Sequence, residues 1–435
     1  MTTRKRGSAP DDIVITGVGV EAPAGIATPD ALWDALLDSE ELLGPMPRDR
    51  GWDLADLFGL GALEGWQTVP DSGGFLDGAA EFDYRHFGVS PREAVAMDPQ
   101  QRVAVRVAYR ALEHAGINPA SLAGTRTGCY LGASVMEYGA RGAEANELSG
   151  HRIAGMALGA VAGRISHLLH LRGPAFTVDA ACASSLTALH IAAQGLRAGD
   201  CDLALVGGAC VMGSAAAFYE FSKANGLARD GHLRAYSADA GGTVWGEGAG
   251  VLVVETAAHA ERHGRRVLGV VHATRLSHNG GGGPIIVPSA AAQRELVADT
   301  AAASGVDPDD IALVEGHGTG TALGDPAELE ALATVYGRGP ETCWLGSIKS
   351  NTGHTQAASG VLGLIKVLLA AGAGTVAPTL HAEHPTERFD WSASRLRLAD
   401  APHPFRAAAG RRYAAVSSFG VAGSNAHAIV SASAH

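Results

Sequence analysis

The 435-residue chain lacks paired cysteines, blocks of basic residues and long uninterrupted apolar runs. Its five cysteines form no CxxC pair and are odd in number, which argues against a disulfide framework and favours a reducing cytoplasm. The net charge is −12 and no basic block follows the first six residues, so nucleic acid is not expected as the main partner. The longest apolar helix candidate, residues 360–371, contains Lys366, so we expect no membrane span.

The beginning of the chain imitates a signal peptide, with basic residues followed by an apolar stretch. Asp11 and Asp12 interrupt that pattern, and the short apolar run after them is more typical of a first strand. We therefore expect residues 1–10 to form a disordered tail. The remaining composition, 46% apolar and 18% charged, is that of an ordinary globular protein with a large core.

Short apolar runs alternate with helical patterns along most of the chain. The runs that predict buried strands are residues 13–20, 127–131, 175–178, 203–206, 251–255, 267–273, 311–315, 344–347 and 413–417. Such alternation predicts an α/β fold with parallel sheet that is buried on both faces. Two series of this kind indicate an internal duplication, which we divide into an N-terminal half, residues 11–260, and a C-terminal half, residues 261–435.

Cys182 is the strongest candidate for a catalytic residue. It follows the predicted strand 175–178 and precedes a helical pattern, so we expect the thiol at a strand-to-helix corner. Unpaired backbone N–H groups at a helix N-terminus favour the thiolate and can hold an oxyanion. This placement favours a nucleophile over the ordinary role of a free cysteine, which is that of a small buried hydrophobic residue.

Two histidines lie at further strand-end corners in the C-terminal half. His317 stands between glycines directly after the predicted strand 311–315, and His354 follows a polar turn that begins at Ser347. Glycines on both sides let the backbone present an imidazole at a tight corner. A cysteine and two histidines so placed suit thioester chemistry. The sulfur accepts an acyl group, and the imidazoles stabilise the enolate left when a malonyl unit loses carbon dioxide.

Two other pairs of histidines raise the question of a metal site. His259 and His263 lie four residues apart, and His381 and His384 lie three residues apart. Neither pair has a convincing third ligand or the HExxH order. The sequence therefore predicts solvated surface at both places and no metal.

These residues, with several further motifs, resemble the β-ketoacyl synthases of the thiolase superfamily, most closely the ketosynthase domains of modular type I polyketide synthases. The matching stretches are residues 87–93, 97–102, 242–248 and 418–427 together with the Cys182 corner and both histidine motifs. They are spread over nearly the whole chain. The resemblance implies a thiolase-like α/β fold in which two duplicated halves pack as a five-layered αβαβα core.

The resemblance also implies a role for each matching residue. Cys182 matches the acylated nucleophile, while His317 and His354 match the pair required for decarboxylation and condensation. Lys349 matches the lysine that orients the site, and Glu328 matches the acidic residue that supports it.

Phe419 matches the aromatic gate, whose backbone N–H is expected to complete an oxyanion hole with that of Cys182. The sequence departs from the family pattern in small ways near these residues. Many relatives have threonine where Ala180 stands, serine where Ala183 stands and alanine where Gly316 stands. These changes leave the nucleophile in place.

We therefore predict an acyltransferase that makes β-ketoacyl thioesters by decarboxylative Claisen condensation, in polyketide or fatty-acid-like biosynthesis. The resemblance implies a cytoplasmic homodimer with no bound cofactor and with substrates on the phosphopantetheine arm of an acyl carrier protein. Because no carrier domain follows the last motif, we expect the carrier in trans. Two alternatives stay open: acyl transfer by the same cysteine without decarboxylation, and a non-catalytic partner subunit of a ketosynthase dimer.

Overall fold

The computed structural model describes residues 9–138, 148–281 and 284–434, so most of the predicted tail lies outside the described residues. Its main sheet has the strand order β10-β8-β7-β12-β13-β6-β1-β5-β4-β2-β3. In chain order these strands are β1 (Ile13–Glu21), β2 (Thr127–Gly132), β3 (Ala175–Val178), β4 (Leu203–Cys210), β5 (Gly248–Thr256), β6 (Gly269–His278), β7 (Ile311–Glu315), β8 (Cys343–Gly346), β10 (Leu396–Leu398), β12 (Arg411–Phe419) and β13 (Ser424–Ser433). A separate small sheet pairs β9 (Thr375–Val376) with β11 (His403–Pro404).

The order of the strands repeats in the two halves of the chain. The run β3-β2-β4-β5-β1 corresponds to the run β8-β7-β12-β13-β6. In both runs the successive pairs are parallel, parallel, antiparallel and antiparallel. The two runs join where β1 pairs with β6 over three residues. The topology therefore contains the predicted duplication. The predicted boundary between residues 260 and 261 stays a prediction, and it falls within α9 (Ala257–Arg262).

The predicted parallel pairing holds for the outer strands of each half, whereas the inner strands pair antiparallel. β13 follows β12 through residues 420–423 alone, and so short a connection joins only antiparallel strands. β13 was not among the predicted strands, because its sequence mixes small and polar residues with few large apolar ones.

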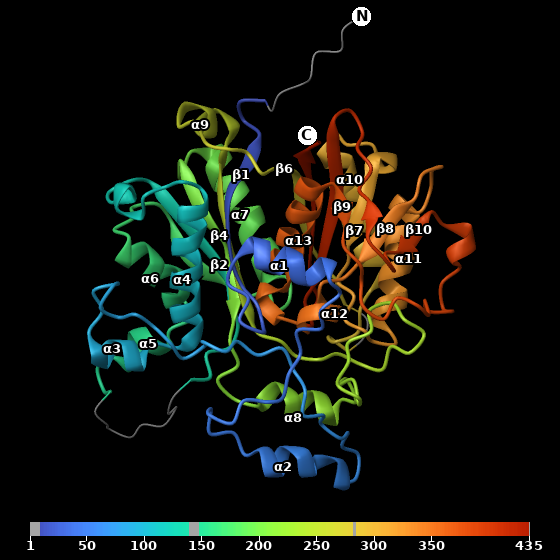
Figure 1. The fold of residues 1–435 in the computed structure, drawn as a ribbon, viewed down its shortest axis with the longest axis horizontal. Helices are drawn as coiled ribbons and strands as arrows, with labels where there is room; N and C mark the ends of the chain where they lie inside the picture. Colours follow the sequence, from blue (N-terminus) through green and yellow to red (C-terminus); the bar gives the residue numbers. More distant parts are fainter. Residues whose placement is uncertain (1–8, 139–147, 282–283, 435) are drawn as a thin grey trace, which may run out of the picture.

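Helices cover both outer faces of the sheets and fill the space between them (Figure 1). α4 and α6 contact the outer face of the N-terminal run, α10 and α11 lie outside the C-terminal run, and α7 and α13 lie between the two. This is a five-layered arrangement of helices and sheets. The helices are α1 (Pro29–Leu37), α2 (Leu54–Gly59), α3 (Pro91–Ala96), α4 (Pro99–His114), α5 (Arg152–Met156), α6 (Ala160–Leu168), α7 (Ser184–Ala198), α8 (Ala216–Lys223), α9 (Ala257–Arg262), α10 (Ala290–Ser304), α11 (Gly324–Tyr336), α12 (Lys349–Thr352) and α13 (Ser359–Ala373).

The central helix α13 is apolar enough to raise the question of a membrane span. Residues 356–373 pass a test of length and composition for such a span, but 78% of that window is buried inside the protein. The one charged side chain of α13, Lys366, forms a buried ion pair of 2.8 Å with Glu315 at the end of β7. The apolar character of α13 therefore corresponds to its buried position between the two halves of the main sheet.

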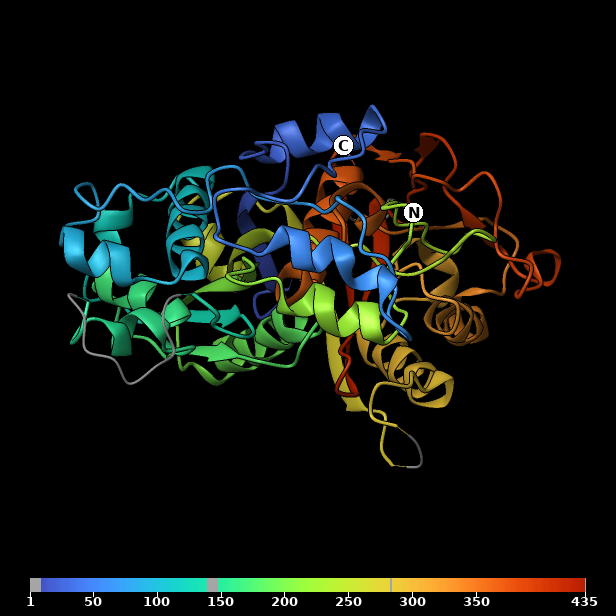
Figure 2. The same cartoon turned by 90° about the horizontal axis from the view of Figure 1, so that it is seen from below.

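α2 and α8 lie together beneath the main sheet (Figures 1 and 2), and the aromatic side chains that pack there form a cap. Trp52 packs against Phe75 and Phe218 with ring centroids 6.0 and 6.1 Å apart. Trp245 belongs to the same apolar cluster and extends from it toward His354. The cap therefore forms one wall of the region that contains the predicted site.

The contact between α7 and α13 generates a prediction about stability. A Cβ atom added at Gly360 would lie 2.7 Å from Leu186 Cγ, whereas one added at Gly372 in the same helix would have nothing within 4 Å. We expect Gly360→Ala to lower the free energy of unfolding by about 1–3 kcal/mol through overpacking. Gly372→Ala is the matched control and is expected to raise it by about 0.5–1 kcal/mol. Urea denaturation followed by circular dichroism measures both, and equal stabilities would contradict a close helix contact at Gly360.

Candidate active site

The backbone turns sharply at Cys182, between β3 and α7. Ala181, the residue before it, has a φ of 50°, a left-handed conformation that non-glycine residues adopt at a cost of about 1–3 kcal/mol. The carbonyl of Cys182 accepts hydrogen bonds from Ser418 Oγ at 2.6 Å and Ser359 Oγ at 3.3 Å. These hydroxyls hold the corner from the C-terminal half, so the position of the thiol depends on both halves of the protein.

The structure brings the three predicted reactive side chains together. Reactive atoms of Cys182, His317 and His354 all lie within 4.8 Å of one another. His354 Nε2 lies 3.1 Å from the Cys182 sulfur, and the rings of the two histidines are 5.4 Å apart at an angle of 85°. One small substrate can therefore touch all three groups.

His354 is held in a defined tautomer. Its Nδ1 accepts a hydrogen bond from the backbone N–H of Gln356 at 3.1 Å, which leaves the ring proton of the neutral imidazole on Nε2. The His354 backbone pairs with residues 244–246, one of the stretches that resemble the family, and the ring lies 5.4 Å from that of Trp245. Nε2–H therefore points toward the sulfur as a hydrogen-bond donor.

His317 is held by the carboxylate of Glu328. Glu328 accepts hydrogen bonds from the backbone N–H of His317 at 2.7 Å, the backbone N–H of Gly318 at 2.9 Å and the hydroxyl of Tyr236 at 2.8 Å. His317 Nδ1 is buried without a hydrogen-bond partner among the described residues. Glu328 therefore fixes the corner that presents His317, and Tyr236 is a member of this network that sequence reasoning missed.

Lys349 is buried at the first turn of α12, with 2% of its surface exposed. Within the described part of the chain, no ion pair within 4 Å joins it to Glu328; the nearby buried ion pair is Lys366–Glu315. Burial lowers the pKa of Lys349, while the carboxylates of Glu315 and Glu328 raise it. Lys349 therefore acts on the site through its electric field, since it also lowers the pKa of Cys182 and of both histidines.

Burial decides the protonation of the reactive groups. It raises the pKa of Cys182 to about 11, although Lys349 and nearby backbone N–H groups act in the opposite direction. It lowers the pKa values of His317 and His354 well below the usual value for histidine, and Lys349 adds to that effect. The sequence predicts a thiolate at the helix N-terminus, but at neutral pH the resting site holds a neutral thiol and two neutral imidazoles.

Phe419, the last residue of β12, and Val421, in the turn after it, relate to the site in different ways. The ring of Phe419 lies 5.6 Å from that of His317, and the side chain is buried. The backbone N–H groups of Val421 and of Cys182 itself act to lower the pKa of the Cys182 thiol. Sequence reasoning missed Val421. Its position in the turn, two residues after Phe419, is the feature of the sequence that could have indicated it.

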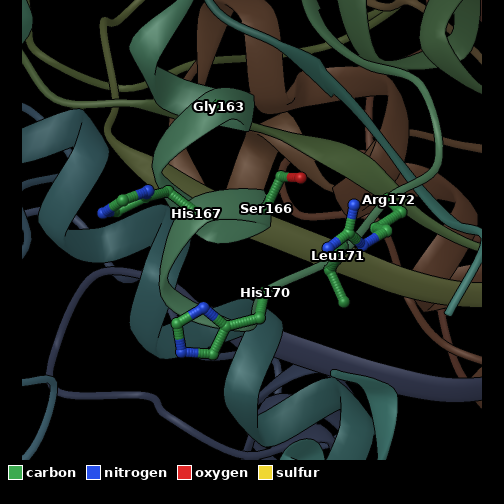
Figure 3. Close-up of a pocket in the computed structure, with 6 residues that line it drawn as sticks. All are labelled: Gly163, Ser166, His167, His170, Leu171 and Arg172. Carbon is green, nitrogen blue, oxygen red and sulfur yellow. The ribbon is translucent and has the colours of Figure 1, made fainter. Parts of the chain in front are cut away.

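A shallow hollow elsewhere on the surface does not resemble a reactive site. It is lined by residues of α6 and the segment after it: Gly163, Ser166, His167, His170, Leu171 and Arg172. Figure 3 shows that the side chains of His167, His170 and Arg172 diverge instead of meeting at one point. None of these residues belongs to the Cys182 site.

The five layers, the duplicated halves and the cysteine beside two histidines define the thiolase-like class of α/β proteins. A family model described as the β-ketoacyl synthase N-terminal domain matches residues 10–260, and one described as the C-terminal domain of the same family matches residues 268–383. The chain belongs to the β-ketoacyl synthase family, which confirms the resemblance seen in the sequence.

Curated relatives of the chain include large synthases. Erythronolide synthase EryA2 of Saccharopolyspora erythraea is 45% identical over 423 residues, which cover 97% of this chain and 12% of the relative. Polyketide synthase GfsB of Streptomyces halstedii is 44% identical over 424 residues, which cover 97% of this chain and 8% of the relative. The chain thus spans only 8–12% of the length of these curated relatives.

Solved structures of ketosynthases share the fold. The ketosynthase from module 6 of the bacillaene synthase of Bacillus subtilis 168 matches with a TM-score of 0.88 and 35% identity, over 97% of this chain and 72% of the other. The oxazolomycin ketosynthase domain OzmH KS7 of Streptomyces albus JA3453 matches with a TM-score of 0.89 and 33% identity, over 97% and 74%. These matches confirm the predicted thiolase-like fold.

Gly316 and Tyr236 generate a prediction, because the tyrosine hydroxyl fills the place of a side chain at Gly316. A Cβ atom added at Gly316 would lie 1.8 Å from that hydroxyl oxygen. We expect Gly316→Ala to lower the free energy of unfolding by about 1–3 kcal/mol through this overlap. Tyr236→Phe alone loses one hydrogen bond, about 1 kcal/mol. The double variant Gly316→Ala, Tyr236→Phe is expected to lose less free energy of unfolding than the sum of the two single losses. Urea denaturation measures all three variants, and strictly additive losses would show that the two positions do not touch.

The pKa of Cys182 generates a second prediction. Since burial raises that pKa to about 11, the thiolate fraction keeps increasing across the neutral and alkaline range. We expect the rate of Cys182 alkylation by iodoacetamide, followed by peptide mass spectrometry, to rise about tenfold per pH unit between about pH 7 and 10. A rate that reaches a plateau near pH 8 would mean that the helix N-terminus outweighs burial.

Proposed function

We propose that this protein is a β-ketoacyl synthase that condenses an acyl group on Cys182 with a malonyl-type unit carried by an acyl carrier protein. The observation that carries the proposal is the triangle of Cys182, His317 and His354, with reactive atoms within 4.8 Å of one another. The similarity to ketosynthases of polyketide synthases supports polyketide biosynthesis as the setting.

In the loading step, the Cys182 sulfur attacks the carbonyl carbon of an acyl thioester on the phosphopantetheine arm. The proton of the thiol ends on the departing pantetheine sulfur, so the step consumes and releases no other group. The backbone N–H groups of Cys182 and Val421 lie by the sulfur and are suited to hold the oxyanion of the tetrahedral intermediate. We assign the donor role to Val421 and place the Phe419 ring as the wall beside His317.

In the condensation step, the malonyl carboxylate leaves as carbon dioxide and the electron pair passes to the thioester carbonyl. His354 Nε2–H and a ring nitrogen of His317 hydrogen-bond to the enolate oxygen that forms, and both imidazoles are neutral at physiological pH because burial lowers their pKa values. The carbanion then attacks the acyl carbon, and the Cys182 sulfur leaves and takes up one proton. Lys349 supplies a fixed positive charge that stabilises the developing anion.

We further propose a homodimer in the cytoplasm. β3 is an edge strand of the main sheet and carries the half-exposed apolar side chain of Phe176. An unpaired apolar edge is a ready surface for pairing with a second chain. All five cysteines are free and buried, which fits a reducing compartment. Sedimentation equilibrium showing only the mass of one protomer would reject the dimer.

Intact-mass spectrometry after mixing with an acyl carrier protein tests the proposed function. We expect an acyl adduct on the natural chain and none on Cys182→Ala. Release of carbon dioxide from malonyl-carrier is expected to fall by about 100-fold or more in His317→Ala and in His354→Ala, since each removes one donor to the enolate. Both variants are expected to keep the Cys182 adduct.

The same experiment separates the alternative functions. An adduct without carbon dioxide release would favour simple acyl transfer by Cys182 over condensation. His272→Ala is a suitable control, since His272 is half-buried on β6 and bonds to Ser431 Oγ at 2.8 Å, outside the Cys182 triangle. A natural chain that forms no adduct with any acyl carrier would contradict both enzymatic functions.

A further inference from the structure

Three side chains from distant parts of the sequence meet close to α12. Glu41 lies in the segment after α1, His232 lies in the loop between α8 and β5, and His381 lies in the segment after β9. His232 Nδ1 lies 2.8 Å from Glu41 Oε1, and His381 Nε2 lies 3.3 Å from the same oxygen. All the ligand atoms lie within 4.8 Å of one another.

We infer that Glu41, His232 and His381 bind one divalent transition-metal ion of the zinc class. Two imidazole nitrogens and one carboxylate oxygen are a donor set that Zn²⁺ accepts, with water in the fourth position. Two ligands on a tetrahedral Zn²⁺ lie about 3.3 Å apart, because each bond is about 2.0–2.1 Å. The two distances to Glu41 Oε1, 2.8 and 3.3 Å, are already close to that spacing.

The three ligands are held in place before any ion binds. Asn351 in α12 donates to the carbonyl of Glu40 at 2.9 Å and accepts from the N–H of Leu42 at 2.7 Å, so it fixes the backbone on both sides of Glu41. Ser350, its neighbour, accepts from the N–H of Leu380 at 3.1 Å, directly before His381. The segments that carry Glu41 and His381 are therefore both hydrogen-bonded to α12, through its consecutive residues Asn351 and Ser350.

His381 adopts a backbone conformation with a φ of 62°. A residue other than glycine in this left-handed region is uncommon, and such strain concentrates at functional sites. The backbone of His232 is held in a turn, because its N–H donates to Asp230 Oδ1 at 3.3 Å. The exposed fractions of the side chains, 43% for His232, 27% for Glu41 and 28% for His381, leave room for a water ligand and for entry of the ion.

The sequence indicated no third ligand for His381 because its partners lie far away along the chain. His384, three residues further along, is not part of this cluster, and its backbone carbonyl accepts hydrogen bonds from Ala238 and Ser237. A bound ion would clamp the segments of Glu41 and His381 around α12, which carries Lys349 and leads into His354. The expected consequence is a more stable active-site wall, without direct participation in the chemistry.

Zn²⁺ binding to metal-free protein tests the inference by isothermal titration calorimetry, with elemental analysis for stoichiometry. The background is Cys182→Ala, since the Cys182, His317 and His354 group is a second cluster that holds Zn²⁺ ligand atoms close together. We expect one equivalent of bound Zn²⁺ and a rise in melting temperature by mass action. His232→Ala, His381→Ala and Glu41→Gln are each expected to weaken binding by about tenfold or more.

His263→Ala in the same background is the matched control, because His259 and His263 are the other close pair of imidazoles, with ring centroids 4.3 Å apart. It should bind Zn²⁺ with unchanged affinity. Co²⁺ provides a second readout: a visible d–d band that is lost in His232→Ala supports the site, and equal melting temperatures of the metal-free variants show that they fold. No Zn²⁺ binding, or binding that is unchanged in all three ligand variants, would overturn the inference.

Discussion

The packing of α7 against α13 between the two halves of the main sheet places Cys182 beside His354, since each of these residues lies a few positions before the start of one of the two helices. The helices approach closely at Gly360, whose missing side chain admits Leu186. Ser359, at the first turn of α13, also donates to the carbonyl of Cys182. The distance from sulfur to imidazole is therefore set by a helix contact in the centre of the core and not by mobile loops.

Burial of these corners explains the electrostatics of the site. A thiol and two imidazoles lose their hydration together, which disfavours the charged form of each and leaves three neutral groups around one substrate position. The buried cation Lys349 and the carboxylate of Glu328 are tolerated because each has compensation: carboxylates act on Lys349, and three hydrogen bonds reach Glu328. The site can thus stabilise negative charge that appears during the reaction while holding no free anion at rest.

Much of this arrangement was predictable from local sequence. The strands 175–178 and 311–315 have the predicted bounds, and the cysteine and two histidines stand at corners that sequence patterns mark with small residues and glycines. The pKa of Cys182 was not predictable, because a helix N-terminus is visible in a sequence whereas desolvation by the other half of the chain is not. Sequence reasoning also missed Tyr236, Val421 and the cluster of Glu41, His232 and His381, because the residues that each of them contacts lie far away along the chain.

The duplicated topology shows how an asymmetric site grows from two similar halves. β3 and β8 are equivalent third strands, and the corner after β3 carries Cys182 while the segment after β8 carries Lys349 and His354. The second strands, β2 and β7, are also equivalent, yet β7 leads to His317 and β2 leads only to Ala133 and Ser134. Because α7 and α13 lie side by side, the two third-strand corners face one another. The nucleophile therefore comes from one half and its hydrogen-bond donors from the other, so neither half could form the site alone.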